Sequence, residues 1–193
     1  MKTLLITCLL TLSSLLSINA QEKTSNVGIK FGYNLAAVSF DGETETGQRH
    51  AFHAGIYGES FFSNHAALQI EFLYSQQGYE LQDNSGRFTQ KLDYINVPLL
   101  LKIYPSDNFY LEAGPQAGLA ISHKEEFDSS FGVFDTTQEF KPNNFDWGMN
   151  FGCGFKTNLG VSLGVRYHLG LGDIYDEGSP QNRVWQFSLG FNL

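Results

Sequence analysis

A period-two alternation of apolar and polar residues recurs in eight segments and most restricts the fold of this 193-residue chain. Successive side chains of a β-strand point to opposite faces, so each such segment has one apolar face and one polar face. In the first segment Val27, Ile29 and Phe31 share one face, whereas Gly28 and Lys30 share the other. Beyond residue 27 no segment shows the three- and four-residue spacing of an amphipathic helix. The pattern therefore predicts a nearly all-β fold.

The lengths of the connections between the eight segments also alternate. After the first segment at 27–35, the others lie at residues 52–62, 68–77, 94–103, 109–122, 147–156, 161–171 and 185–193. Short turns are expected at 63–65, 105–108 and 157–160, and long loops at 41–50, 78–90, 123–144 and 173–183. Short turns at one end and long loops at the other are typical of outer membrane barrels. We therefore expect an all-β, eight-stranded antiparallel up-and-down transmembrane β-barrel, with its loops outside the cell.

The polar faces of these segments carry charges, whereas the apolar faces are almost free of them. Seven charged residues fall on the polar faces: Lys30, Glu59, Glu71, Lys102, Glu112, Lys156 and Arg166. A soluble lipid-carrying barrel has the opposite arrangement, with an apolar interior and a wet exterior. Four cations and three carboxylates cannot be buried unpaired, but they can pair across a narrow barrel. We expect them to form an interior charge network that leaves no open pore, while the apolar faces contact outer membrane lipid.

The first twenty residues are predicted to be a cleavable signal peptide. A basic start at Met1-Lys2 precedes an apolar stretch at 4–16, and Ala20 is a small residue at the expected cleavage site. The stretch is short and interrupted by serines, which disfavours an uncleaved anchor. Cys8 lies inside it rather than at its end, which disfavours a lipoprotein signal. Residues 21–193 would then be the barrel domain, with Cys153 as its single cysteine.

The formal net charge of −8 excludes nucleic acid as an expected partner, because phosphate binding needs a basic patch. Much of the acid lies in the predicted loops, at Asp41, Glu43, Glu45, Glu125, Glu126, Asp128, Asp173, Asp176 and Glu177. No calcium-loop pattern accompanies these residues, so they are interpreted as a solvated surface that contacts a protein partner.

No catalytic, cofactor-binding or metal-binding residue is predicted. His50 and His53 are three residues apart in a strand and should point to opposite sides of the sheet. Ser162 and His168 share a polar face, but six residues of strand separate them by about 20 Å. The sequence Gly-Cys-Gly at 152–154 is no phosphate cradle, because no helix follows it.

Two alternatives to a non-enzymatic barrel remain open. A membrane-embedded lipid hydrolase or acyltransferase would need a serine or carboxylate within hydrogen-bond distance of His168, or of another histidine near the membrane boundary. A small, narrow, porin-like channel would need a continuous water path past Lys30, Glu71, Glu112 and Arg166.

Two further features concern the barrel wall. Pro98 and Pro115 fall inside predicted strands, where each removes a ladder donor, and we expect a paired bulge or a local kink there. Five aromatic residues are candidates for interfacial girdles: Tyr33, Tyr74, Trp147, Tyr167 and Trp185.

A family resemblance supports the barrel prediction. Residues 92–102 read LDYINVPLLLK and residues 110–115 read YLEAGP, which resembles the central signature of the PorT-like outer membrane β-barrel family. The blocks GIKFGYNL at 28–35, LYSQQG at 73–78, LGVRY at 163–167 and FSLGF at 187–191 are similar to its other blocks. The resemblance implies an outer membrane barrel in which both prolines are family features, and it supplies no catalytic residue. The final Leu193 departs from the usual terminal aromatic, so we expect a weakened insertion signal.

Overall fold

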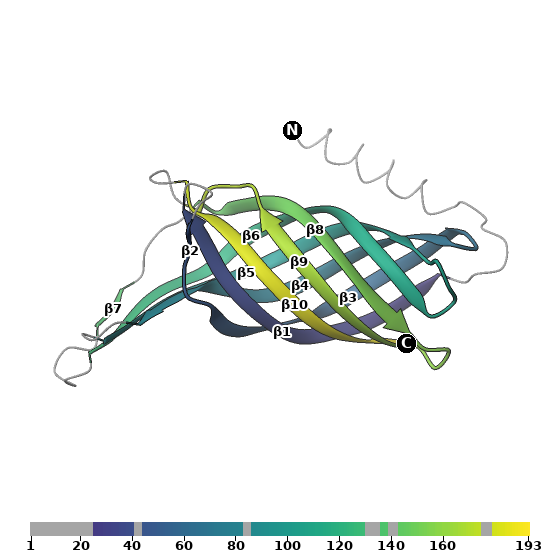
Figure 1. Ribbon diagram of the computed structural model, residues 1–193, viewed down its shortest axis with the longest axis horizontal. Helices are drawn as coiled ribbons and strands as arrows, with labels where there is room; N and C mark the ends of the chain where they lie inside the picture. The colour runs from purple at the N-terminus through teal and green to yellow at the C-terminus, as the bar shows by residue number, and fades with distance from the viewer. Residues whose placement is uncertain (1–24, 41–43, 83–85, 130–135, 139–142, 175–178) are drawn as a thin grey trace.

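Eight long antiparallel strands form a closed barrel in the computed structural model (Figure 1). The structure describes residues 25–40, 44–82, 86–129, 136–138, 143–174 and 179–193. The barrel strands are β1 (Asn26–Phe40), β3 (Arg49–Ser63), β4 (Ala66–Gln82), β5 (Gly86–Ile103), β6 (Phe109–Ser129), β8 (Phe145–Lys156), β9 (Val161–Gly170) and β10 (Gln181–Asn192). Two short strands, β2 (Thr44–Glu45) and β7 (Thr136–Gln138), pair with the far ends of β1 and β6.

Pairing of the last strand with the first closes the barrel. Strands adjacent in sequence are paired, and β10 pairs with β1 from Gly28–Asn192 to Ser39–Gln181. Closure leaves no open strand edge in the wall, as a bilayer requires. The prediction of an eight-stranded antiparallel up-and-down barrel is confirmed. Among the described residues, no helix is long and apolar enough to cross a membrane.

The two ends of the barrel differ, as the connection lengths predict. Short turns join β3 to β4, β5 to β6 and β8 to β9, and the last residues of the chain lie at the same end (Figure 1). We call this end the turn end and the opposite one the loop end. At the third turn Gly160 has a φ of 80°, a conformation that glycine adopts without strain.

The predicted long loop at 78–90 is wrong over most of its length, and the one at 123–144 is wrong over part of it. Within residues 78–90 β4 continues to Gln82 and β5 begins at Gly86, and within residues 123–144 β6 continues to Ser129. These segments form a sheet that projects beyond the wall at the loop end (Figure 1). Their polar composition suggested loops, but apolar and polar residues still alternate there, with Tyr79 and Leu81 interleaved with Glu80 and Gln82. Cross-strand pairs such as Lys91 Nζ with Glu126 Oε2, at 2.5 Å, join the projecting strands.

The prolines do not cause the bulge that their positions suggested. The register between β5 and β6 is the same on both sides of Pro98, since Val97 lies opposite Ala117 and Leu101 opposite Ala113. Pro115 lies opposite Met149 in an unshifted ladder. Register shifts occur instead at 61–63 and 93–94. A missing N–H removes a ladder bond, but it inserts no extra residue and therefore leaves the register unchanged.

The outer face of the wall is apolar. Each of the eight long strands exposes at least two large apolar side chains on it. Four of the predicted girdle residues, Tyr33, Trp147, Tyr167 and Trp185, have outward side chains, and the rings of Tyr167 and Trp185 pack 4.8 Å apart. Tyr74, the fifth, is also on this face and donates a hydrogen bond to Asp93 over 2.9 Å.

Candidate functional site in the barrel lumen

Buried aromatic side chains fill the lumen at the turn end. Phe61, Ala67, Tyr104 and Tyr110 form this cluster, and the ring centroids of Phe61 and Tyr104 lie 5.2 Å apart. The hydroxyl group of Tyr104 donates a hydrogen bond to Glu59, which begins the charged layer above the cluster. The lumen is therefore closed by packed side chains at this end.

Glu59 accepts from two lysines on different strands. Nζ of Lys102 on β5 lies 3.3 Å from Oε1 of Glu59, and Nζ of Lys156 on β8 pairs with Oε2. Lys102 also donates to Oε1 of Gln69 over 2.9 Å, and its ammonium group lies 3.8 Å from the ring centroid of Tyr110. Hydrogen bonds and a cation–π contact thus compensate the loss of hydration at these buried charges.

Arg166 spans the lumen. Its Nη1 and Nη2 atoms each donate to Glu71 over 2.8 Å, and its Nε atom donates to Glu112 over 2.7 Å. In the closed order of eight strands β9 and β4 are four strands apart in either direction, so Arg166 and Glu71 come from opposite sides of the barrel. Lys30 on β1 adds a 2.5 Å contact to Glu71. The two parallel bonds from Arg166 to Glu71 form a bidentate pair, which is the strong form of a charge-assisted hydrogen bond.

The structure brings together all seven charged residues that the alternation placed on the polar face. Each carboxylate lies within 4.0 Å of two cations, although the distance from Lys102 to Glu112 is the full 4.0 Å. The cavity that remains beside Lys30, Lys102 and Lys156 measures about 10 Å³, which is room for one water molecule.

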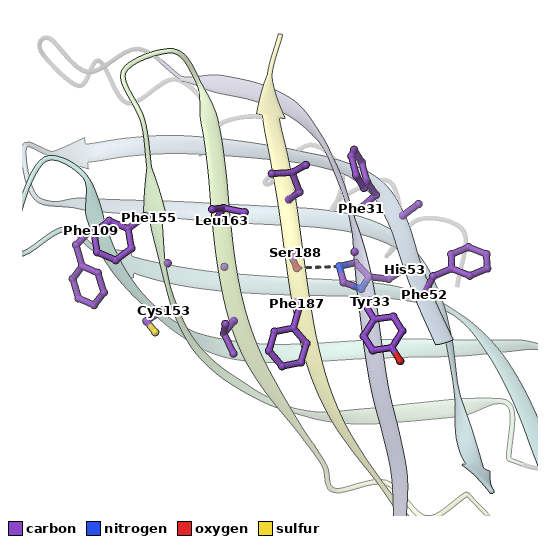
Figure 2. A pocket seen from close by; sticks show the side chains of 16 residues that line it. Phe31, Tyr33, Phe52, His53, Phe109, Cys153, Phe155, Leu163, Phe187 and Ser188 are labelled. Carbon is purple, nitrogen blue, oxygen red and sulfur yellow. Dashed lines mark hydrogen bonds between the residues drawn. The ribbon is translucent and has the colours of Figure 1, made fainter. Parts of the chain in front are cut away.

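A second polar layer contains a serine–histidine contact that the sequence did not reveal. Figure 2 shows Nε2 of His53 on β3 hydrogen-bonded to Oγ of Ser188 on β10, at 3.0 Å. Nδ1 of His53 lies 2.7 Å from Oδ1 of Asn34. Since Asn34 donates its amide protons to Ser75 and to a main-chain carbonyl, its oxygen is the acceptor, and Nδ1 of His53 carries the proton.

The contact between His53 and Ser188 depends on the residue between them. Gly32 on β1 lies opposite both, and a β-carbon there would lie 2.7 Å from Cε1 of His53. His53 and Ser188 are 135 residues apart, so only the closure of the barrel reveals the pair.

His50 and His168 lie where their spacing predicts. His50 is on the outer face and pairs with the Tyr33 hydroxyl group, on the opposite side of the wall from His53. Nδ1 of His168 lies 3.0 Å from Oδ1 of Asn150, and no hydrogen bond to a serine is found at His168 among the described residues. Within the same part of the chain, no three His, Cys, Asp or Glu side chains converge as a metal site.

The loop end of the lumen is closed by a second apolar cluster. Val38, Tyr79, Leu92, Tyr94 and Ile174 are buried there in mutual contact. Two of them, Tyr79 and Ile174, lie in segments predicted as loops, so the sequence analysis missed this cluster. The alternation of Tyr79 and Leu81 with Glu80 and Gln82 in the sequence was the signal that a strand continues there.

Residues 19–176 of the chain match the family described as "Outer membrane protein beta-barrel domain". The chain belongs to this family. It is therefore a small outer membrane β-barrel, and the predicted localisation is confirmed.

Solved structures show the same fold. Ail of Yersinia pestis, in complex with the heparin analogue sucrose octasulfate, is similar with a TM-score of 0.53 and 17% identity, over 89% of this chain and 100% of Ail. Neisserial surface protein A is similar with a TM-score of 0.50 and 14% identity, over 89% of this chain and 99% of that protein. No curated protein matches the chain in sequence.

Membership of this family places the apolar outer face in contact with lipid. An apolar groove of about 800 Å³ crosses that face over β3, β1, β10, β9, β8 and the start of β6. Figure 2 shows the side chains that border it, among them Phe31, Phe52, Phe155, Leu163 and Phe187. The groove has the chemistry of a surface that lipid acyl chains cover.

Proposed function

We propose that this outer membrane barrel is a non-enzymatic platform whose acidic loop end binds a cationic partner outside the cell. The observation that carries the proposal is the filled lumen. Arg166 joins β9 to β4 across the barrel, and apolar clusters occupy the lumen on either side of the polar layers. A wall stabilised from inside in this way is suited to holding the loop end in place rather than to passing solute.

The distribution of charge identifies the chemistry of the partner. Residues 41–50, 78–90, 123–144 and 173–183 contain 13 acidic and 5 basic residues, which amounts to the whole net charge of −8. Of the acids singled out from the sequence, Asp41, Glu43, Asp176 and Glu177 lie outside the described residues. A negative potential at one end attracts cationic surfaces and repels polyanions. The heparin analogue bound by Ail is a polyanion, so we propose the opposite preference for this chain.

The family resemblance extends this proposal. We infer that the chain is of the PorT-like type, on the strength of the block at 92–102. We also infer that residues 1–20, which lie outside the described residues, are removed as a signal peptide during export.

Binding of charged probes by the folded full-length protein tests the platform. A lysine-rich peptide should bind the barrel in detergent micelles at low salt and dissociate as salt screens the charges. The triple variant Glu80→Gln, Glu125→Gln, Asp173→Asn should bind the peptide more weakly, whereas the turn-end control Asp107→Asn should bind like the wild type. Equal binding by wild type and triple variant, or a preference for sucrose octasulfate, would contradict the proposal.

One observation favours an acyl-transferring enzyme as a second candidate. Ser188, His53 and Asn34 are hydrogen-bonded in the order that activates a serine nucleophile. His53 is only 1% exposed, however, and its side chain points into the filled lumen rather than to the lipid. Because the donors of β1 and β10 are used in the strand ladder, the main chain beside Ser188 forms no oxyanion hole. These features favour a structural hydrogen bond.

A serine-reactive fluorophosphonate probe distinguishes the two candidates. We expect no labelling of the folded protein at Ser188, with the Ser188→Ala variant as the background control. Labelling that disappears in Ser188→Ala would overturn the non-enzymatic proposal.

A further inference from the structure

Three buried polar side chains meet in the lumen near the loop end, apart from the charge network. Asp146 lies on β8, His168 on β9 and Asn182 on β10, and their exposed fractions are 4%, 1% and 0%. Nδ2 of Asn182 donates to Oδ2 of Asp146 over 2.9 Å. Nε2 of His168 lies 3.8 Å from the same oxygen. The side chains of Asn182 and His168 thus both lie beside one carboxylate oxygen of Asp146.

Each of the three residues carries an atom without a hydrogen-bond partner among the described residues. These atoms are Oδ1 of Asp146, Nε2 of His168 and Oδ1 of Asn182. Unpartnered buried polar atoms are uncommon because their desolvation is not compensated, so those of the neighbouring Asp146 and His168 side chains point to a bound water or ligand.

The charge of Asp146 is also uncompensated by lysine or arginine. The other lumen carboxylates, Glu59, Glu71 and Glu112, each pair with such a side chain. Within the described part of the chain, the nearest cationic candidate for Asp146 is His168. A buried carboxylate in this position favours a bound cation.

Hydrogen bonds set His168 in the form that binds metals. Its Nδ1 atom lies 3.0 Å from Oδ1 of Asn150, and Nδ2 of Asn150 donates to Gln116 over 3.1 Å. This chain of hydrogen bonds assigns a proton to Nδ1, so Nε2, on the side of Asp146, is the ring nitrogen available to a metal. Metal-binding histidines typically donate their second N–H to an oxygen in this way.

Glycines keep the space around the donors open. A β-carbon at Gly172 would lie 3.2 Å from Oδ1 of Asp146, and one at Gly148 would lie 2.8 Å from Cε1 of His168. Larger residues at either position would therefore press against the cluster.

We propose that Asp146, His168 and Asn182 form a binding site for a divalent transition-metal ion such as Zn²⁺. Imidazole and carboxylate are usual zinc ligands, and a half-turn of the Asn182 amide places its oxygen 2.9 Å from Oδ2 of Asp146. Ligands around 2.1 Å from an ion lie about 3.0–3.4 Å apart in octahedral or tetrahedral geometry. The separations of 2.9 and 3.8 Å at Asp146 Oδ2 lie on either side of that range, so small side-chain movements complete the site.

Co²⁺ is a suitable spectroscopic probe, because its visible absorption reports coordination by the protein. The folded full-length barrel in detergent should bind one Co²⁺ per chain, and Zn²⁺ should displace it. The variants His168→Gln and Asp146→Asn should each weaken binding by about tenfold or more. His53→Gln is the matched control, because both ring nitrogens of this second lumen histidine are hydrogen-bonded to protein atoms.

Asp146→Asn keeps the test valid if His168→Gln fails to fold, since it removes a buried charge that lacks a lysine or arginine partner. Heat-modifiable gel mobility identifies the folded samples. The site is overturned if folded wild-type protein takes up no Co²⁺, or if binding persists in Asp146→Asn. The site is likewise overturned if His53→Gln loses Co²⁺ binding while His168→Gln and Asp146→Asn keep it.

Discussion

Replacing Arg166 by methionine should destabilise the barrel more than any comparable surface change. The guanidinium group makes three hydrogen bonds, to two buried carboxylates on strands β4 and β6. Methionine keeps much of the side-chain volume but none of these bonds. Glu71 would retain Lys30 at 2.5 Å, whereas Glu112 would retain only Lys102 at 4.0 Å among the described residues.

The expected magnitude follows from that difference. Three charge-assisted hydrogen bonds at about 1.5–3 kcal/mol each give a nominal total of about 4.5–9 kcal/mol. Bonds within one network are not additive, because the remaining partners and entering water compensate in part. Removing one partner of a buried ion pair costs about 3–5 kcal/mol. We therefore expect the free energy of unfolding to fall by about 4 kcal/mol.

Urea unfolding of the protein in detergent micelles measures this loss. With a slope near 2 kcal/mol per molar urea, the midpoint should fall by about 2 M. Arg87→Met is the matched control, because Arg87 pairs with Glu80 at 3.2 Å on the projecting sheet with half of its side chain exposed. Exposed pairs contribute at most about 1 kcal/mol. If Arg166→Met and Arg87→Met shift the midpoint equally, the cross-lumen bonds do not stabilise the barrel.

Three further predictions concern the wall and the turn end. Gly32→Val should lower the urea midpoint sharply, because a β-carbon there would lie 2.0 Å from the carbonyl oxygen of Phe187 and 2.7 Å from Cε1 of His53; an unchanged midpoint would contradict this close packing. A fluorophore on Cys153, which is exposed on the outer face, should be quenched by lipid-bound quenchers and not by aqueous iodide, and the reverse would contradict its orientation. Tyr104→Phe should lower stability by about 1–2 kcal/mol through the hydrogen bond lost at Glu59, and no change in the urea midpoint would refute that role.

The barrel and the faces of its residues could be predicted from the sequence because both are local properties. A period of two places Glu71 and Arg166 on the polar face whatever the partner strands are. Their mutual contact could not be predicted, because it depends on the strands being on opposite sides of a closed barrel of eight.

The errors have physical causes as well. Composition suggested a loop at 78–90, yet the strands continue there because neighbouring strands satisfy their backbone groups beyond the wall. The contact of His53 with Ser188 and the meeting of Asp146 with His168 and Asn182 join residues of different strands on the lumen face of the wall. Residue spacing within one strand contains no information about such contacts.

Planar-bilayer recording of the folded wild-type protein tests whether the lumen is filled. We predict a flat current trace, because Arg166, its carboxylate partners and the two apolar clusters fill the lumen. Insertion is verified on the same membrane by fluorescence of protein labelled at Cys153. Discrete, reproducible conductance steps from inserted wild-type barrels would contradict a filled lumen and favour a narrow channel.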